Sequence, residues 1–309
     1  MQQSDSVKPV NKNSMSKRLR DYMLLVKFSL TIMVVFSAVI SYLLAPKVVA
    51  YDWLMITLLF LAGFLVTGSA NTINQVVEKD TDALMKRTAN RPIASGRMSV
   101  TEGWAFAVVT GILGVFMLWY FFNGLSAALA AFSLFLYAFI YTPLKKVNAI
   151  SVLVGAFPGG LPCLIGFAAG NDTIVAGEHG WQDLGGWALF AIQFFWQFPH
   201  FWAIAWLAHK DYETAGFKML PSDQGPTKYS AVQSIIYSVL LVPVGLLPYL
   251  IGLTGWVSML IVLLSNLGMI YLSVRLYMDM EKGAARKVMF GSYIYLMVIF
   301  FALVADKIK

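Results

Sequence analysis

Long apolar segments follow one another along most of the chain and are separated by short polar stretches. Nine of them are long enough to cross a bilayer as helices, which takes about 20 residues each. They cover residues 24–45, 53–77, 103–122, 125–143, 149–169, 185–208, 230–252, 256–275 and 288–305. Only Asn123 and Gly124 separate the third from the fourth, which predicts a tight helical hairpin. We therefore expect an all-α, polytopic membrane protein with nine transmembrane helices in one bundle.

Composition supports this class. The chain has 309 residues, of which 59% are hydrophobic and only 13% are charged, whereas soluble domains have about 25% charged residues. The apolar segments continue from end to end, so we expect one transmembrane domain over residues 23–309 rather than two soluble domains. The single cysteine excludes an internal disulfide and a cysteine-based metal cluster.

Charge along the chain predicts its orientation. Most of the 23 Lys and Arg residues lie in the N-terminal segment and in the loops after the second, fourth, sixth and eighth apolar segments. The 170–184 loop has Asp172, Glu178 and Asp183 but no Lys or Arg. Because cytoplasmic loops are enriched in basic residues, we expect a cytoplasmic N-terminus. The same bias explains the net charge of +7 without nucleic acid as a partner. We expect residues 1–22 to form a disordered basic cytoplasmic tail.

Small residues are frequent between Asn148 and Gly170, a stretch that also contains Pro158 and Pro162. Small side chains let helices approach each other closely in membranes, and prolines bend helices or break them. This stretch predicts a tightly packed, irregular helix.

An acidic cluster follows the second apolar segment. Asn74, Glu78 and Asp82 recur every four residues and therefore share one helical face, whereas Asp80 points elsewhere. Mg²⁺ prefers oxygen ligands and commonly binds one or two carboxylates together with substrate phosphates. Arg87 and Arg91 follow, and guanidinium groups bind phosphate oxygens in bidentate fashion. The pattern favours a magnesium-bound diphosphate site with Asn74, Glu78 and Asp82 as metal ligands; the alternative is a solvated helix end with its acids paired to neighbouring cations.

The pattern of these residues resembles a known family. Asn74-x-x-x-Glu78-x-x-x-Asp82 followed by Met85-x-Arg87-Thr88-x-x-Arg91-Pro92 is similar to the intramembrane aromatic prenyltransferase superfamily. The second part is most similar to the protohaem IX farnesyltransferases, or haem O synthases, within it. Glu78 stands where the family usually has Asp, and Gln75 where an aromatic residue or Asn is frequent.

Tyr141 and Lys145 close the fourth apolar segment. They match a Tyr-x-x-x-Lys element of the superfamily, and the resemblance implies that both lie at the diphosphate. As a compact cation, Lys145 is able to stabilise a departing pyrophosphate. The alternative for Lys145 is an anchor at the cytoplasmic interface, the role that we assign to Lys146.

The sixth apolar segment has an unusual polar centre, with Gln193, Gln197 and the pair Pro199-His200 among aromatic residues. His200 can bind a haem through its iron or by a hydrogen bond, or act as a base. Alternatively, it is a histidine hydrogen-bonded between helices. The run Gln197-Phe198-Pro199-His200-Phe201 resembles the haem O synthases in particular.

The next loop extends this resemblance through Asp211-Tyr212-x-x-Ala215-Gly216-x-x-Met219-Leu220-Pro221. The resemblance implies Asp211 as a carboxylate for a second Mg²⁺, with Lys210 and Tyr212 as substrate contacts. Only one acid remains here of the pair found elsewhere in the superfamily. A solvated loop without chemistry is the alternative.

Together, these resemblances imply a magnesium-dependent enzyme of the bacterial cytoplasmic membrane, with a central cavity that opens to the cytoplasmic side. It would transfer a farnesyl group from farnesyl diphosphate to the vinyl group of haem b, with addition of water, to give haem O for terminal oxidases. A downstream haem A-forming enzyme is a possible partner. Three other functions stay open: a prenyltransferase for a quinone precursor, a secondary transporter, and a non-catalytic assembly factor.

Overall fold

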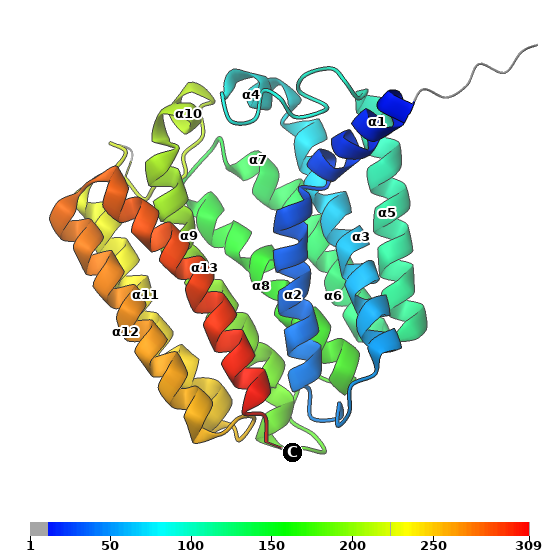
Figure 1. Ribbon diagram of the computed structural model, residues 1–309, viewed down its shortest axis with the longest axis vertical. Helices are drawn as coiled ribbons and strands as arrows, with labels where there is room; N and C mark the ends of the chain where they lie inside the picture. Colours follow the sequence, from blue (N-terminus) through cyan, green and yellow to red (C-terminus); the bar gives the residue numbers. More distant parts are fainter. Residues whose placement is uncertain (1–11, 223, 309) are drawn as a thin grey trace, which may run out of the picture.

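The computed structural model describes residues 12–222 and 224–308, which form helices and no named strand (Figure 1). The long helices are α2 (Phe28–Leu44), α3 (Trp53–Val77), α5 (Val100–Phe121), α6 (Gly124–Phe135), α8 (Ile150–Asn171), α9 (Gly185–Leu207), α11 (Lys228–Leu250), α12 (Trp256–Asp279) and α13 (Lys282–Ala305). The shorter elements are α1 (Lys12–Leu25), α4 (Lys79–Leu84), the π-helical η1 (Leu136–Tyr141), α7 (Thr142–Leu144), the 3₁₀ helix η2 (Trp181–Leu184) and α10 (His209–Thr214). The all-α prediction is confirmed.

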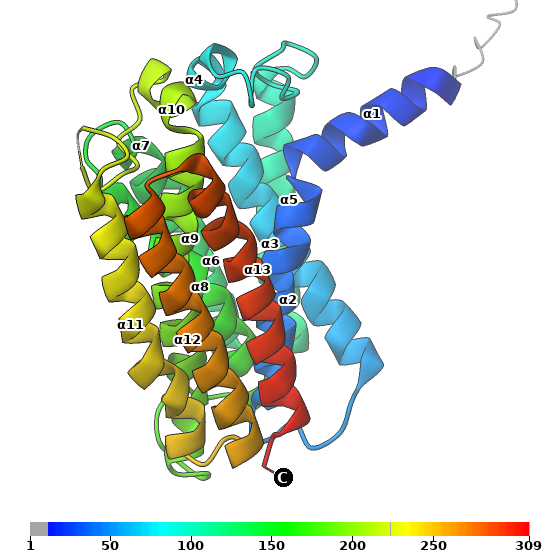
Figure 2. The same cartoon turned by 60° about the vertical axis from the view of Figure 1, so that its left-hand side comes forward.

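The long helices form one bundle with α8 near its centre. α8 contacts α2, α6 and α9, while α3 pairs with α5 and α11 with α12. The short helices α4 and α10 lie at the same end of the bundle in both views (Figures 1 and 2). Residues from two long loops, far apart in sequence, are therefore gathered at one end.

The number of membrane crossings differs from the prediction. Within the described residues, seven helices are long and apolar enough to cross a membrane, and the bent α1–α2 pair would add an eighth. α9 has 23 residues but is not among them. Its centre carries Gln193, Gln197 and His200, which lower the hydropathy of the segment. The prediction of nine crossings is therefore not confirmed.

The structure describes only part of the segment predicted as a disordered tail. Residues 1–11 lie outside the described residues, but from Lys12 the chain is helical as α1, which extends away from the bundle at a 51° bend to α2 (Figure 2). Two contacts attach α1 to the loop before α5 and to α5 itself: Arg97 Nε lies 2.9 Å from Asp21 Oδ1, and Tyr22 donates a 2.8 Å hydrogen bond to Glu102. These long-range contacts order a segment whose composition alone predicts disorder.

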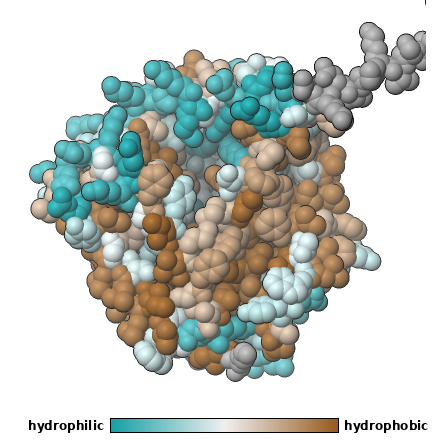
Figure 3. Space-filling model, in the orientation of Figure 1, coloured by the Kyte–Doolittle hydropathy of each residue, from teal (hydrophilic) through white to brown (hydrophobic). Residues whose placement is uncertain are grey.

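The surface has the polarity of a membrane protein. Large apolar side chains of the outer helices are exposed, among them Ile112, Trp119 and Leu264. Polar residues gather instead at the end of the bundle that carries α4 and α10 (Figure 3). Extensive exposed apolar surface is rare on soluble monomers, and lipid covers it in a bilayer.

Side-chain caps define the helix starts near the predicted hairpin. Ser99 caps α5 by accepting a hydrogen bond from Glu102 N, and Asn123 caps α6 by accepting one from Ser126 N. α5 and α6 contact each other across a connection of two residues, Phe122 and Asn123. The hairpin prediction is confirmed.

Candidate active site

The polar residues at the end of α3 keep helical spacing across a helix junction. Glu78 lies between α3 and α4, yet its N–H donates to Asn74 O at 2.9 Å and its carbonyl accepts from Asp82 N at 2.7 Å. The side chains of Asn74, Glu78 and Asp82 are all buried. Buried carboxylates need charged or hydrogen-bonding partners, and each of these residues has a different one.

Asp82 is paired with an arginine of the loop that follows α4. Arg91 Nη1 donates to both oxygens of Asp82, at 2.8 and 2.6 Å. The Asp82 side chain is fully buried, whereas that of Arg91 is 18% exposed. Thr88 also donates to the backbone carbonyl of Asp82 and fixes the turn between them. The guanidinium therefore separates a buried carboxylate from the open side of the site.

Glu78 is paired with Lys145, whose Nζ donates to Glu78 Oε1 at 2.9 Å. Lys145 also lies 4.6 Å from the ring centroid of Tyr141, a cation–π contact. Tyr141 ends the π-helical η1, and Thr142 donates to Tyr137 O five residues earlier, as the wider turn requires. Such π turns are frequent at functional sites. The predicted pair Tyr141 and Lys145 thus lies beside the acidic cluster.

Asn74 is paired with Lys27, a residue that sequence reasoning assigned to the interior of the first apolar segment. Lys27 Nζ donates to Asn74 Oδ1 at 2.9 Å. Lys27 lies at the bend between α1 and α2, with a left-handed φ of 51°. A lysine inside an apolar segment is costly and usually functional. The position of Lys27 within residues 24–45 could therefore have marked it as a candidate site residue.

The second polar loop reaches the site through its aromatic residues. Arg87 Nη2 lies 3.4 Å from Tyr212 OH and its guanidinium lies over the Tyr212 ring. Lys145 also lies 5.8 Å from the Phe217 ring centroid. Tyr212 therefore lies beside Arg87, and Phe217 is a neighbour of Lys145 that sequence reasoning missed. The role of Tyr212 as a substrate contact stays a prediction.

In the described part of the chain, no side-chain hydrogen bond or ion pair joins Asp211 or Lys210 to Asn74, Glu78 or Asp82. Across residues 12–222 and 224–308, no group of three or more His, Cys, Asp and Glu side chains is arranged to hold a metal ion. The structure therefore brings Glu78 and Asp82 together with cations but does not add Asp211 to them. The roles of Asp211 and Lys210 stay predictions.

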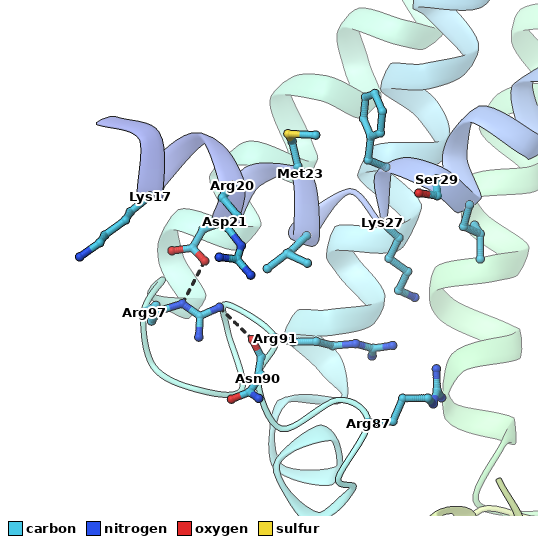
Figure 4. Close-up of a pocket in the computed structure, with 13 residues that line it drawn as sticks. Lys17, Arg20, Asp21, Met23, Lys27, Ser29, Arg87, Asn90, Arg91 and Arg97 are labelled. Carbon is cyan, nitrogen blue, oxygen red and sulfur yellow. Dashed lines mark hydrogen bonds and ion pairs between the residues drawn. The ribbon is translucent and has the colours of Figure 1, made fainter. Parts of the chain in front are cut away.

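A pocket of about 1010 Å³ opens beside the acidic cluster, and six of the residues that line it are Lys or Arg. Lys27, Arg87 and Arg91 extend into the same space (Figure 4). Lys17, Arg20 and Arg97 also line it, and among the described residues Asp21 is the one acidic side chain in the lining. A concentration of Arg and Lys with so little acid suits a ligand with several negative charges, such as a diphosphate.

A second cavity, of about 680 Å³, lies inside the bundle and is mostly apolar. Helices α2, α3, α5, α6, α8, α9 and α13 contribute to its wall, and so do Tyr137 and Tyr141 of η1. Ser29 and Leu30 line both this cavity and the cationic pocket. The two spaces are therefore adjacent, with a charged site at one end of an apolar one.

The donor chemistry fits Mg²⁺. Glu78 and Asp82 supply two carboxylates and Asn74 supplies an amide oxygen, while Mg²⁺ commonly takes one or two carboxylates together with phosphate oxygens and water. The acids are paired with Lys145 and Arg91, and cations of this kind also bind phosphate. The oxygen donors thus suit a metal cation, and the neighbouring Lys and Arg residues suit a phosphate bound beside it.

Fold and site define a polytopic helical membrane protein with a cationic pocket beside an apolar cavity, and comparison with known proteins gives its family. The UbiA prenyltransferase family matches residues 34–302, so the chain belongs to this family. A relative from Cytophaga hutchinsonii, named protoheme IX farnesyltransferase, is 42% identical over 294 residues, which cover 95% of this chain and the whole of the relative.

Solved structures show the same fold at lower sequence identity. The structure of a digeranylgeranylglyceryl phosphate synthase has a TM-score of 0.75 and 21% identity, and the alignment covers 94% of this chain and 98% of the other. A UbiA homologue from Archaeoglobus fulgidus, solved with GPP and Mg²⁺, has a TM-score of 0.63 and 16% identity and covers 92% and 99%.

Proposed function

We propose that this chain transfers the farnesyl group of farnesyl diphosphate to the vinyl group of haem b and, with addition of water, forms haem O. Identity of 42% along the whole of a protoheme IX farnesyltransferase supports this substrate pair. The single structural observation that carries the proposal is the cationic pocket beside buried Glu78 and Asp82, adjacent to an apolar cavity. A diphosphate suits the first space, and a prenyl chain and a porphyrin suit the second.

In this proposal the acidic cluster holds the substrate through Mg²⁺. Glu78 and Asp82, with Asn74 and with Asp211 from the second loop, would be its ligands. Bound Mg²⁺ would neutralise negative charge that develops on the diphosphate. The ion in the Archaeoglobus fulgidus homologue supports this role, since that structure contains both Mg²⁺ and GPP.

The basic residues stabilise the leaving group. Arg87 and Arg91 line the pocket, and Lys145 lies beside Glu78. These three cations, with Lys210, would bind the pyrophosphate as the carbon–oxygen bond breaks, because charge stabilisation is strongest where charge develops in a site shielded from water. Tyr141, beside Lys145, would contact the diphosphate end of the substrate, and Tyr212 would hold Arg87 in place.

The apolar cavity controls when water reacts. The farnesyl carbon that loses pyrophosphate bonds to the terminal carbon of the vinyl group, and water then adds to the other vinyl carbon with loss of a proton. Water that reached the farnesyl carbon earlier would give farnesol instead. The mostly apolar lining favours the first order of events because it excludes water until the porphyrin is in place.

Mass spectrometry of the product tests the proposal. We expect purified protein with haem b, farnesyl diphosphate and Mg²⁺ to form haem O, and to form none when Mg²⁺ is chelated. Replacing haem b with 4-hydroxybenzoate tests the quinone-precursor alternative and should give no prenylated product. Prenylation of the benzoate but not of haem would overturn the proposed acceptor.

We further propose nine membrane crossings, made by the seven apolar helices, the α1–α2 pair and α9. The N-terminus, α4 and α10 would face the cytoplasm of a bacterium, and the cationic pocket would open there. The basic loops at this end support the orientation. Haem O would then pass to a haem A-forming enzyme in the same membrane.

A further inference from the structure

His200 is held rigidly in the middle of α9. Its side chain is 95% buried, and its ring lines the apolar cavity. The ring stacks on Trp196, with centroids 4.7 Å apart and an interplanar angle of 14°, and meets Tyr293 edge-on at 4.7 Å. Trp196 in turn donates to Ser292 O of α13 at 2.7 Å. The orientation of the imidazole is therefore fixed before any ligand binds.

The hydrogen bonds around Ser292 define the tautomer of His200. His200 Nδ1 and Ser292 Oγ are 2.8 Å apart. Ser292 Oγ also donates to Met289 O at 2.7 Å, and a backbone carbonyl can only accept. A hydroxyl has one proton, so towards His200 it must act as the acceptor. Nδ1 therefore carries the proton, and Nε2 has a free lone pair.

No residue of the described part of the chain makes a hydrogen bond to His200 Nε2, although the ring lines open space. A neutral imidazole that donates from one nitrogen to a protein oxygen and leaves the other nitrogen bare has the arrangement of a metal-ligating histidine. Nε2 thus has the chemistry of a ligand but no partner within the protein.

Neither of the other two histidines lines the apolar cavity. The chain has three in all; His179 lies in the loop before α9 and His209 begins α10, and neither lines the cavity. The volume of about 680 Å³ is within the range of small-molecule sites, about 300–1,000 Å³. Met33, also in the lining, is the other side chain there with a soft donor atom.

We propose that His200 Nε2 binds the iron of haem b as an axial ligand and so positions the porphyrin for farnesylation. This inference rests on the proposed function, because it takes haem b as the acceptor. The two nitrogens of one ring then have separate roles: Nδ1 joins α9 to α13, and Nε2 holds the substrate. His200 acts as a positioning residue for the vinyl group.

Resonance Raman spectroscopy of the ferrous haem complex tests this directly, since an iron–imidazole stretching band reports axial histidine. We expect the wild-type protein to show the band, His200→Ala to lose it, and added imidazole to restore it in that variant. Met33→Leu is the matched control, because it removes the other soft donor of the same cavity at nearly constant volume, and it should keep the band.

Ser292→Ala provides a test that leaves the ligand in place. Without an acceptor for Nδ1–H the tautomer and ring orientation are no longer fixed, and we expect haem affinity to fall about 10-fold or more. A band that persists in His200→Ala, or that is absent from wild-type protein with bound haem, overturns the inference even if haem O is formed. Failure of wild-type protein to bind haem or make haem O overturns the proposed function as well.

Discussion

At the scale of single residues, the site is an arrangement of charges that are neutralised in pairs. Asp82 is fully buried and is paired with Arg91, which is partly exposed at the pocket wall. Breaking a buried pair by removing one partner is strongly unfavourable because it leaves a charge without compensation. A diphosphate with Mg²⁺ offers both partners a replacement at once: the cation for the acid and the phosphate for the guanidinium.

Asp82→Asn should impair catalysis strongly, and its cost in stability is reduced because the charge left behind, Arg91, is partly exposed to water. The amide keeps the size of the side chain but loses the charge, and we expect kcat/KM for farnesyl diphosphate to fall by about 100-fold or more. Asp80→Asn is the matched control, since Asp80 is exposed on another face of the same short helix. Equal activity of both variants, measured with Mg²⁺ in excess, would count against the assignment of Asp82.

The sequence alone identified the acidic cluster more readily than the cations that pair with it. Asn74, Glu78 and Asp82 were recognisable because their spacing is local and a helix brings them together. Lys27 and Lys145 reach them from other helices, and such long-range pairings depend on how the bundle packs. For the same reason Asp211 could be proposed as a ligand from the family pattern, but no local rule decides its distance from Glu78.

At the scale of helices, α8 shows why small residues matter in this bundle. A Cβ on Gly166 would collide with the backbone carbonyl of Ala38 in α2, whereas a Cβ on Gly268 in α12 would meet no atom within 4 Å. The prediction of close packing for α8 is confirmed by this contact. α8 is assigned as one continuous helix through Pro158 and Pro162, so of the two expected effects of the prolines, a bend or a break, the break is absent.

The two glycines provide a paired test of stability. We expect Gly166→Ala to lower the free energy of unfolding by about 1–3 kcal/mol, because overpacking forces α2 and α8 apart. Gly268→Ala should be neutral or should stabilise α12 by up to about 1 kcal/mol, the difference in helix propensity. Thermal unfolding in detergent distinguishes them, and a smaller loss at position 166 than at 268 would contradict the packing described.

Asp183, in the segment between α8 and α9, should make the stability of the protein depend on pH. Burial raises the pKa of Asp183, but hydrogen bonds from the Asn171 side chain and from the backbone of His179 and Gly177 outweigh it, so the pKa lies below its ordinary value of 3.8. A carboxylate with a depressed folded pKa contributes stability that is present above the unfolded pKa. That contribution is lost as the pH falls through the folded pKa.

Asp183→Asn should consequently lower the Tm near neutral pH and flatten its decline below about pH 4. The exposed Glu178, in the same loop, gives the control Glu178→Gln, which should follow the wild-type curve. Scans of Tm from pH 7 to pH 3 measure both. Identical slopes for Asp183→Asn and wild type in the acid range would show that Asp183 does not carry this dependence.

Element boundaries show the limits of reading helices from hydropathy. The hairpin at Asn123 was predictable because a polar cap interrupts two apolar runs. α1 was not, because contacts with Arg97 and Glu102 order it rather than its own composition. The π-helical turn of η1, which brings Tyr141 beside Lys145, has no recognised pattern in the sequence.

At the scale of the whole molecule, composition and charge predicted the class and the organisation. An apolar chain with its basic residues in alternate loops is typical of a polytopic membrane protein, and the bundle brings those loops to one end (Figure 1). The interior cavity could not be derived from the pattern, because it is the space left between seven of the described helices and depends on how they are spaced.

Single cysteines introduced on a Cys163→Ala background test the orientation. Lys146→Cys in the loop before α8 should react with an impermeant maleimide only after the cytoplasmic face is opened. Val175→Cys, in the loop between α8 and α9, should react in intact cells. The reverse pattern would place the cationic pocket on the outer side and would contradict the proposed topology.

The central claim is that buried acids and surrounding cations at one end of the bundle hold a magnesium diphosphate. Calorimetric titration with farnesyl thiolodiphosphate, an analogue that resists cleavage, measures this without turnover. The account predicts binding that requires Mg²⁺, is lost in Asp82→Asn and is kept in Asp80→Asn. Equal affinity in the presence of excess chelator, or in Asp82→Asn, would contradict it.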